Sequence, residues 1–192
     1  IEIIRLKTGG FVILTTDLCV ANRYDENLQL DWSNINRTGS KCLRMWKTDD
    51  LVNFSEEKLQ YFGRDDFGCM WAPEVFYDKE KEMYMIYWSN AQHFRETDEW
   101  TKTVMWYTYT KDFRSLETEP QILYAPPCDK DAIDGDIIEK DGVFYLYYKD
   151  ENEKFICYVY SDCLTGPYKE PENKKVSLYD EDTEGCCMYK IA

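Results

Sequence analysis

The sequence lacks an excess of positive charge, and it lacks any apolar run long enough to cross a membrane. Acidic residues outnumber basic residues by 37 to 23, which gives a net charge of −14. A polyanionic partner would be repelled by this charge, so neither nucleic acid nor an anionic membrane is expected to bind. No segment approaches the roughly 20 apolar residues that a spanning helix needs. A neutral or cationic ligand is easier to accommodate.

Metal-binding patterns are also missing. The only histidine is His93, and the eight cysteines include no CxxC pair. Structural zinc sites use such ligands at short spacings, so we expect no metal site and no other cofactor. The vicinal Cys186 and Cys187 and the scattered remainder are typical of reduced thiols buried in strands. The chain begins at Ile1 with neither Met nor a signal peptide, so its N-terminus is expected to lie upstream and its compartment, intracellular or secreted, stays open.

Aromatic residues and short apolar runs dominate what is present. Aromatic side chains make up 16% of the sequence, with 16 Tyr and 6 Trp. Such residues suit pleated strands better than a helical bundle. No stretch carries the sustained 3.6-residue period of a long helix. At 192 residues, the chain has the size of one ordinary domain. We therefore expect an all-β fold.

The apolar runs recur in the same order along the chain. In one unit, residues 136–138 lead through an Asp141-Gly142 turn into 143–148, which we expect to be a strand buried on both faces. Each unit has three or four strands and a Ser/Thr-x-Asp-like corner. This period matches the four-stranded blade of a β-propeller, and a β-sandwich is the alternative. The polar segment 17–40 is long enough to indicate a functional or partly ordered loop. Blades are expected at about residues 1–70, 71–131 and 132–182, with the first strand of a fourth in 183–192.

Carboxylates fall in register when the units are aligned on their first apolar pairs. One column then holds Glu2, Glu74 and Asp136. A second column, two residues earlier, holds Ala72, Asp134 and, by its following glycine, Glu184. Inner blade strands converge on an axis, so Asp134 and Glu184 should face a shared cleft. Like charges held close cannot both ionise freely, so the pKa of one carboxyl should rise. A general acid requires such a raised pKa. The alternative is that both are turn residues on a rim.

Five short motifs, in this order, carry a family resemblance: Thr16-Asp17-Leu18, Thr48 to Ser55, Met70 to Glu74, Ala132-Ile133-Asp134 and Glu184-Gly185. The chain resembles the arabinofuranosidase and β-xylosidase members of glycoside hydrolase family 43. That resemblance implies a five-bladed β-propeller, of which this chain would supply about three blades and the start of a fourth. It also implies an inverting glycosidase acting on pentose-containing oligosaccharides or polysaccharides.

The resemblance assigns roles to particular residues. Glu184 resembles the family's general acid, and Asp134 resembles the aspartate that tunes and orients that acid. Trp71 resembles a residue that lines the sugar pocket, where an aromatic face stacks on a sugar ring. Glu74, in the same motif, is also predicted to contact substrate. Packing between blades is an equally good explanation of Trp71.

Two departures from the family pattern bear on activity. The general-base aspartate would align just before Ile1, so the chain as given is expected to be inactive or nearly so. Cys186 also stands where the family motif has proline, which loosens the loop after Glu184. The alternative functions are a non-catalytic carbohydrate-binding or degenerate propeller, and a protein-interaction propeller.

Overall fold

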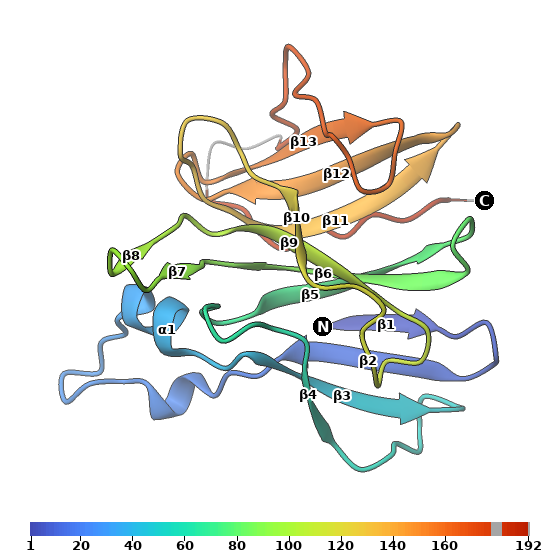
Figure 1. Ribbon diagram of the computed structural model, residues 1–192, viewed down its shortest axis with the longest axis horizontal. Helices are drawn as coiled ribbons and strands as arrows, with labels where there is room; N and C mark the ends of the chain where they lie inside the picture. Colours follow the sequence, from blue (N-terminus) through green and yellow to red (C-terminus); the bar gives the residue numbers. More distant parts are fainter. Residues whose placement is uncertain (178–181, 192) are drawn as a thin grey trace.

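The computed structural model describes residues 1–177 and 182–191, which fold as stacked antiparallel sheets (Figure 1). The first sheet has the order β1-β2-β3-β4, formed by Glu2–Arg5, Phe11–Thr16, Cys42–Thr48 and Lys58–Tyr61. The second has the order β5-β6-β9-β10, formed by Trp71–Asp78, Met83–Asn90, Val104–Thr110 and Gln121–Tyr124. The third has the order β11-β12-β13, formed by Ala132–Lys140, Val143–Asp150 and Phe155–Ser161. A small hairpin joins β7 (His93–Phe94) to β8 (Glu99–Trp100).

Each of the three large sheets is a meander, the arrangement of a propeller blade. The sheets lie one above another in Figure 1, and β5 contacts both β1 and β11. The all-β, propeller-type fold predicted from the repeat is therefore confirmed. Residues 182–191 carry no strand and run beside β11, and the start of a fourth blade at residues 183–192 stays a prediction. Residues 178–181 and 192 of the expected third and fourth units lie outside the described residues.

Strand β6 explains why the central runs are apolar throughout. Successive side chains of a strand point to opposite faces, so a sheet covered on both sides needs apolar residues at every position. Tyr84, Ile86 and Trp88 belong to the core shared with the first sheet. Met85 and Tyr87 belong to the core shared with the third sheet. The second sheet is thus the middle layer, and its two faces hold the stack together.

Strand β12 differs from the prediction made for it. Leu146 and Tyr148 are fully buried against the second sheet, whereas Tyr145 and Tyr147 on the other face are only half-buried. The expectation that this strand is buried on both faces is wrong, because the third sheet packs on the second through one face. The aromatic residues of the opposite face give the run its apolar character without placing it in a core.

The repeated corners are formed by side chains that accept hydrogen bonds from the backbone. Thr48 Oγ1 accepts from the amides of Asp50 and Leu51, and Thr110 Oγ1 accepts in the same way from residues 112 and 113. Leu51 and Phe113 both adopt left-handed backbone angles, with φ of 60° and 62°. Because the same bonds recur at the same place in two sheets, the repeat read from the sequence is a repeat of structure.

The polar segment 17–40 is partly ordered as short helices. It contains the short 3₁₀ helix η1 (Val20–Asn22) and the helix α1 (Trp32–Thr38). Asp31 caps α1 by accepting a 2.9 Å hydrogen bond from the Asn34 amide. Two turns are too short to produce a detectable helical period, which is why the sequence did not predict α1. No helix within the described residues is long and apolar enough to cross a membrane.

Candidate functional site

Inner strands β5 and β11 carry the same backbone irregularity. The pairing register shifts between Trp71 and Glu74 in β5, and between Ile133 and Asp136 in β11. Such bulges re-aim a side chain at the end of a strand. Left-handed residues lie within both irregularities, namely Ala72 with φ of 44° and Asp134 with φ of 53°. Ala72 and Asp134 therefore occupy equivalent positions, as the alignment of the units predicts.

Asp134 lies against the segment that carries Glu184. The Gly185 amide donates a 3.1 Å hydrogen bond to Asp134 Oδ2, and Cys186 Sγ donates to the Asp134 carbonyl at 3.1 Å. Burial raises the pKa of Asp134, and the negative charge of Glu184 adds to that rise, although the Gly185 hydrogen bond opposes it. The structure thus brings together the two residues predicted to act as acid and modulator. The roles themselves stay predictions.

Lys149, on β12, is the residue of this region that sequence reasoning missed. Its side chain is only 3% exposed, and its ammonium lies 2.8 Å from Asp182, 2.9 Å from Glu184 and 3.1 Å from Glu151. Burial alone would lower the pKa of Lys149, but hydrogen bonds to these carboxylates outweigh burial and raise the pKa. The only sign of Lys149's role in the sequence is its position at the end of an aromatic strand, next to an aspartate. The same pattern is typical of the polar end of an ordinary strand.

A second group of carboxyls lies deeper along the inner strands. Glu2 and Glu74 hydrogen-bond to each other, and burial together with the charge of Glu2 raises the pKa of Glu74 to about 9. Burial is also the main cause that raises the pKa of Asp136 to about 6. Glu74 is consequently protonated at neutral pH, with carboxyls as its neighbours, and its contact with substrate stays a prediction. The described residues include no group of His, Cys, Asp or Glu placed to hold a metal ion.

Trp71 joins β5 to helix α1. Its Nε1 donates a 2.8 Å hydrogen bond to Asn36 Oδ1, and Asn36 Nδ2 donates in turn to Thr103 Oγ1 at 3.1 Å. The Trp71 ring lies 6.4 Å from the ring of Trp32, which is 54% exposed. The hydrogen bonds show a packing role for Trp71, and the exposed Trp32 extends the aromatic surface beside it. Stacking of Trp71 on a sugar stays a prediction.

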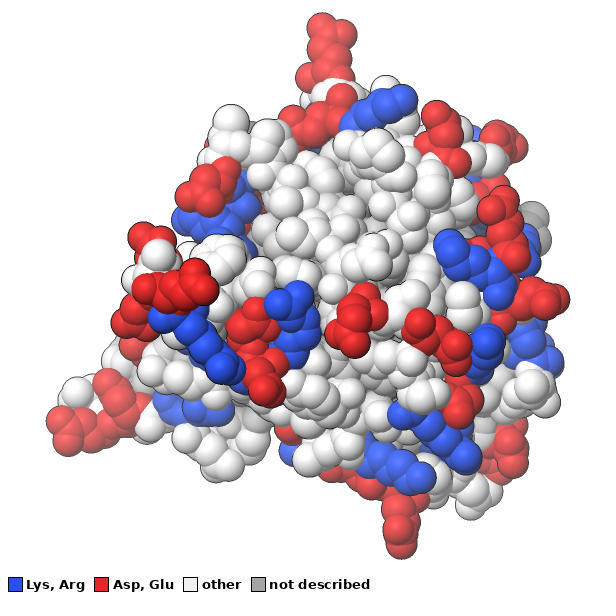
Figure 2. Space-filling view, viewed as in Figure 1, with Lys and Arg blue, Asp and Glu red and all other residues white. Residues whose placement is uncertain are grey.

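The described surface also has two hollows that other residues line. One, of about 700 Å³, includes Arg64, Asp66 and His93. The other, of about 860 Å³, lies on the open face of the third sheet and includes Tyr145, Tyr147 and Tyr158. On the face shown in Figure 2, acidic and basic side chains are interspersed around the rim and leave a broad area of uncharged residues between them. Neither hollow has Asp134 or Glu184 in its lining.

The stacked meanders and the carboxyl groups on their inner strands define a β-propeller domain of the kind found in glycoside hydrolases. A family model described as a probable glycosyl hydrolase domain, related to family 43, matches residues 2–192. The chain belongs to this family. A sequence search of curated proteins finds no match.

Several solved structures of glycoside hydrolases have the same fold. A thermostable family-43 glycoside hydrolase superposes with a TM-score of 0.61 at 12% identity, over 90% of this chain and 53% of that one. An endo-arabinase from Bacteroides thetaiotaomicron gives 0.58 at 12% identity, over 91% and 61%. An α-L-arabinofuranosidase from Podospora anserina, in complex with cellotriose, gives 0.53 at 13%, over 83% and 44%. The likeness is one of fold, and the chain spans about half the length of these structures.

Proposed function

We propose that this chain forms part of a glycoside hydrolase that cleaves arabinose- or xylose-containing oligosaccharides or polysaccharides with inversion. Glu184 is the general acid, and Asp134 orients it. The observation that carries the proposal is the contact between Asp134 and the segment of Glu184, closed by the 3.1 Å hydrogen bond from Gly185. Membership of the probable glycosyl hydrolase family supports it.

The chemistry follows from the needs of an inverting hydrolysis. The acid protonates the departing glycosidic oxygen while a base activates a water molecule on the opposite face of the sugar. Acid and base must stand about 6.5 to 9.5 Å apart to leave room for that water. Asp134 is suited to a supporting role because it is half-buried and its carboxylate accepts a backbone hydrogen bond from the segment that carries Glu184. The general base is not assigned to any residue of this chain.

The test is hydrolysis of aryl α-L-arabinofuranosides and aryl β-D-xylosides by the full-length protein. We expect turnover of at least one substrate, and a loss of about 100-fold or more in kcat for Glu184→Gln. Asp134→Asn should also lower kcat. Full activity of either variant would refute the role given to that residue.

A binding assay distinguishes the proposal from a non-catalytic carbohydrate-binding propeller. Xylo- and arabino-oligosaccharides are titrated into the wild-type protein by calorimetry, and the mixtures are then analysed for cleavage. Binding without cleavage would favour the non-catalytic alternative. Neither binding nor cleavage would favour a protein-interaction propeller.

A further inference from the structure

We infer that Lys149 is a positioning residue for the general acid: its buried ammonium holds one oxygen of Glu184 and leaves the other to carry the proton that is transferred. This inference rests on the proposed function and adds to it a cation that the sequence motifs do not contain. It is carried by the placement of Lys149 between the strand end that bears Asp134 and the segment that bears Glu184.

The geometry is that of a fixed donor at one carboxylate oxygen. Lys149 Nζ lies 2.9 Å from Glu184 Oε2, whereas the Glu184 side chain as a whole is 66% exposed. A charge-assisted bond from a buried donor is stronger than one made in water. The ammonium therefore restrains an exposed acid at one oxygen. Oε1 stays available to a substrate.

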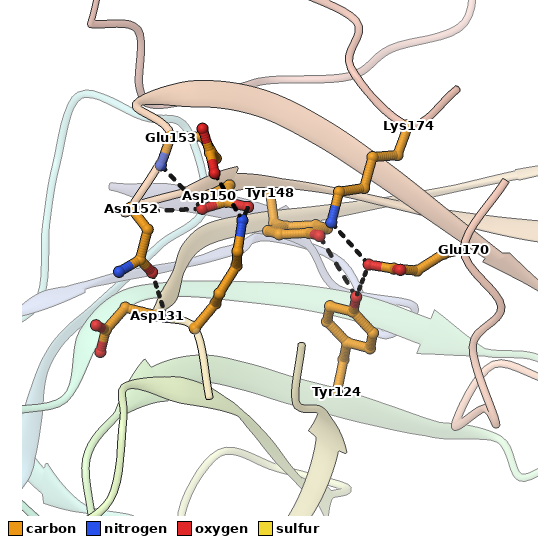
Figure 3. Close-up of polar contacts among 9 residues, drawn as sticks. Tyr124, Asp131, Tyr148, Asp150, Asn152, Glu153, Glu170 and Lys174 are labelled. Carbon is orange, nitrogen blue, oxygen red and sulfur yellow. Dashed lines mark hydrogen bonds and ion pairs between the residues drawn. The ribbon is translucent and has the colours of Figure 1, made fainter. Parts of the chain in front are cut away.

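The residues on either side of Lys149 in β12, Tyr148 and Asp150, are held by hydrogen bonds on the other face of the strand (Figure 3). Asp150 accepts hydrogen bonds from the amides of Asn152 and Glu153, both at 3.1 Å, and is fully buried. Tyr148, also fully buried, lies with its hydroxyl 3.4 Å from that of Tyr124, which in turn donates to Glu170. Because both neighbours in sequence are fixed, the backbone of Lys149 cannot easily shift. A donor fixed before reaction costs little reorganisation during it.

The Lys149 ammonium can stabilise the negative charge that develops on Glu184 during proton transfer. As the glycosidic C–O bond breaks, the proton moves from Glu184 Oε1 to the departing oxygen, and a carboxylate is left behind. A cation already bonded to Oε2 stabilises that carboxylate more than the neutral acid, so the bond strengthens as the proton leaves Glu184. An arginine in place of Lys149 would supply the same positive charge with a different side-chain geometry, so it should replace the lysine only in part.

Other charged groups face the same ammonium and set a limit on its effect. Asp182, 61% exposed, and Glu151 compete with Glu184 for Lys149, and Lys154 lies near Glu151 as a second cation. Asp134 lies close enough for its own carboxyl to respond to Lys149. Removing the charge of Asp182 should therefore leave more of the ammonium's charge for Glu184.

The experiment measures kcat/KM of the full-length protein on two glycosides of one sugar. A dinitrophenyl glycoside has a leaving group that departs without a proton, and a phenyl glycoside needs one. We expect Lys149→Met to lower kcat/KM about 100-fold on the phenyl substrate and less than about threefold on the dinitrophenyl substrate. Lys149→Arg should recover part of the loss. Lys111→Met, which removes a distant surface lysine, is the matched control.

Each outcome decides between a positioning role and a structural one. Equal losses on both substrates, or no loss on either, would overturn the inference. If Lys149→Met does not fold, Asp182→Asn provides the test in its place, because it changes an exposed side chain. We expect a rise in kcat/KM on the phenyl substrate alone, and a fall on both substrates would overturn the inference. Full activity of Glu184→Gln would instead refute the acid role of Glu184 on which the inference rests, and absence of hydrolysis by the wild-type protein would refute the proposed function itself.

Discussion

Glu74 on β5 shares a hydrogen bond with Glu2 on β1, so two half-buried acids join the inner strands of neighbouring sheets. A carboxyl–carboxylate pair of this kind holds one proton more tightly than an isolated carboxyl does. Asp136 on β11 adds a third carboxyl to the same column, and its charge raises the pKa of Glu74 further. The inner strands are therefore joined by groups whose protonation depends on pH.

Stability should fall as the pH rises from about 4.5 to about 9. In the folded state Glu74 keeps its proton to about pH 9, whereas the ordinary value is 4.5. The folded state thus binds more protons in this window, so the free energy of unfolding decreases with pH and the contribution is lost above the folded pKa. Thermal unfolding from pH 5 to 9.5 checks this. Glu74→Gln should flatten the slope, unlike the exposed Glu80→Gln. A wild-type midpoint that rises over this range would contradict the expectation.

Two glycine substitutions should differ sharply in cost. A Cβ at Gly68 would lie 2.2 Å from the carbonyl oxygen of Asn36, and backbone cannot move aside cheaply. A Cβ at Gly135 would meet the Met105 side chain at 2.6 Å, and the end of a methionine can turn away. We expect Gly68→Ala to destabilise the fold by about 3 kcal/mol and Gly135→Ala by about 1 kcal/mol. Denaturant unfolding measures both, and equal costs would be inconsistent with this packing.

Trp71 should affect stability through its nitrogen and ligand binding through its ring. Trp71→Phe removes the donor to Asn36 and should cost about 1 kcal/mol of unfolding free energy. If the ring also stacks on a sugar, Trp71→Phe should keep most of the affinity for xylo-oligosaccharides and Trp71→Ala should lose it. Calorimetric titration of both variants gives the comparison. Equal affinities of the phenylalanine and alanine variants would limit Trp71 to packing.

The cysteines should divide by burial when they are alkylated. All eight are free thiols, but Cys19, Cys128, Cys163 and Cys187 are exposed. Only Cys157 is both buried and in a strand, so the expectation of strand-buried thiols is wrong for the others. Burial raises the pKa of Cys69 to about 12 and that of Cys157 to about 11. Thiolate is the reactive form, so iodoacetamide at pH 8 should label the exposed cysteines first. Mass spectrometry of the peptides reports the order, and rapid labelling of native Cys69 would oppose it.

Much of the fold follows from local patterns that sequence reasoning can detect. The Asp141-Gly142 turn is formed with φ of 54° and 80°, as its residue types require. The corners at Thr48 and Thr110 depend on side chains bonding to amides two or three residues away, so they too are visible in sequence. Helix α1 was not predicted because seven residues show no clear period. What a strand's second face meets, as at Tyr147, depends on distant segments.

The residues of the candidate site also differ in whether local sequence can identify them. Asp134 could be singled out because its motif and its column in the repeat are both local features. Lys149 could not, because its three carboxylate partners lie in the turn after its own strand and in residues 182–184, and nothing in the sequence says that these segments meet. The proton held by Glu74 was likewise beyond sequence reasoning, since it depends on burial.

The left-handed step at Ala72 and Asp134 has a consequence for how such a chain can change. One blade bears a methyl group at this step and its neighbour bears a carboxylate, yet the main chain bends alike at both places. A single substitution at the start of an inner strand is thus enough to add or remove a carboxylate, because the backbone conformation that places it is already present. A propeller built from such blades can acquire or discard reactive groups codon by codon, while its architecture stays as it was.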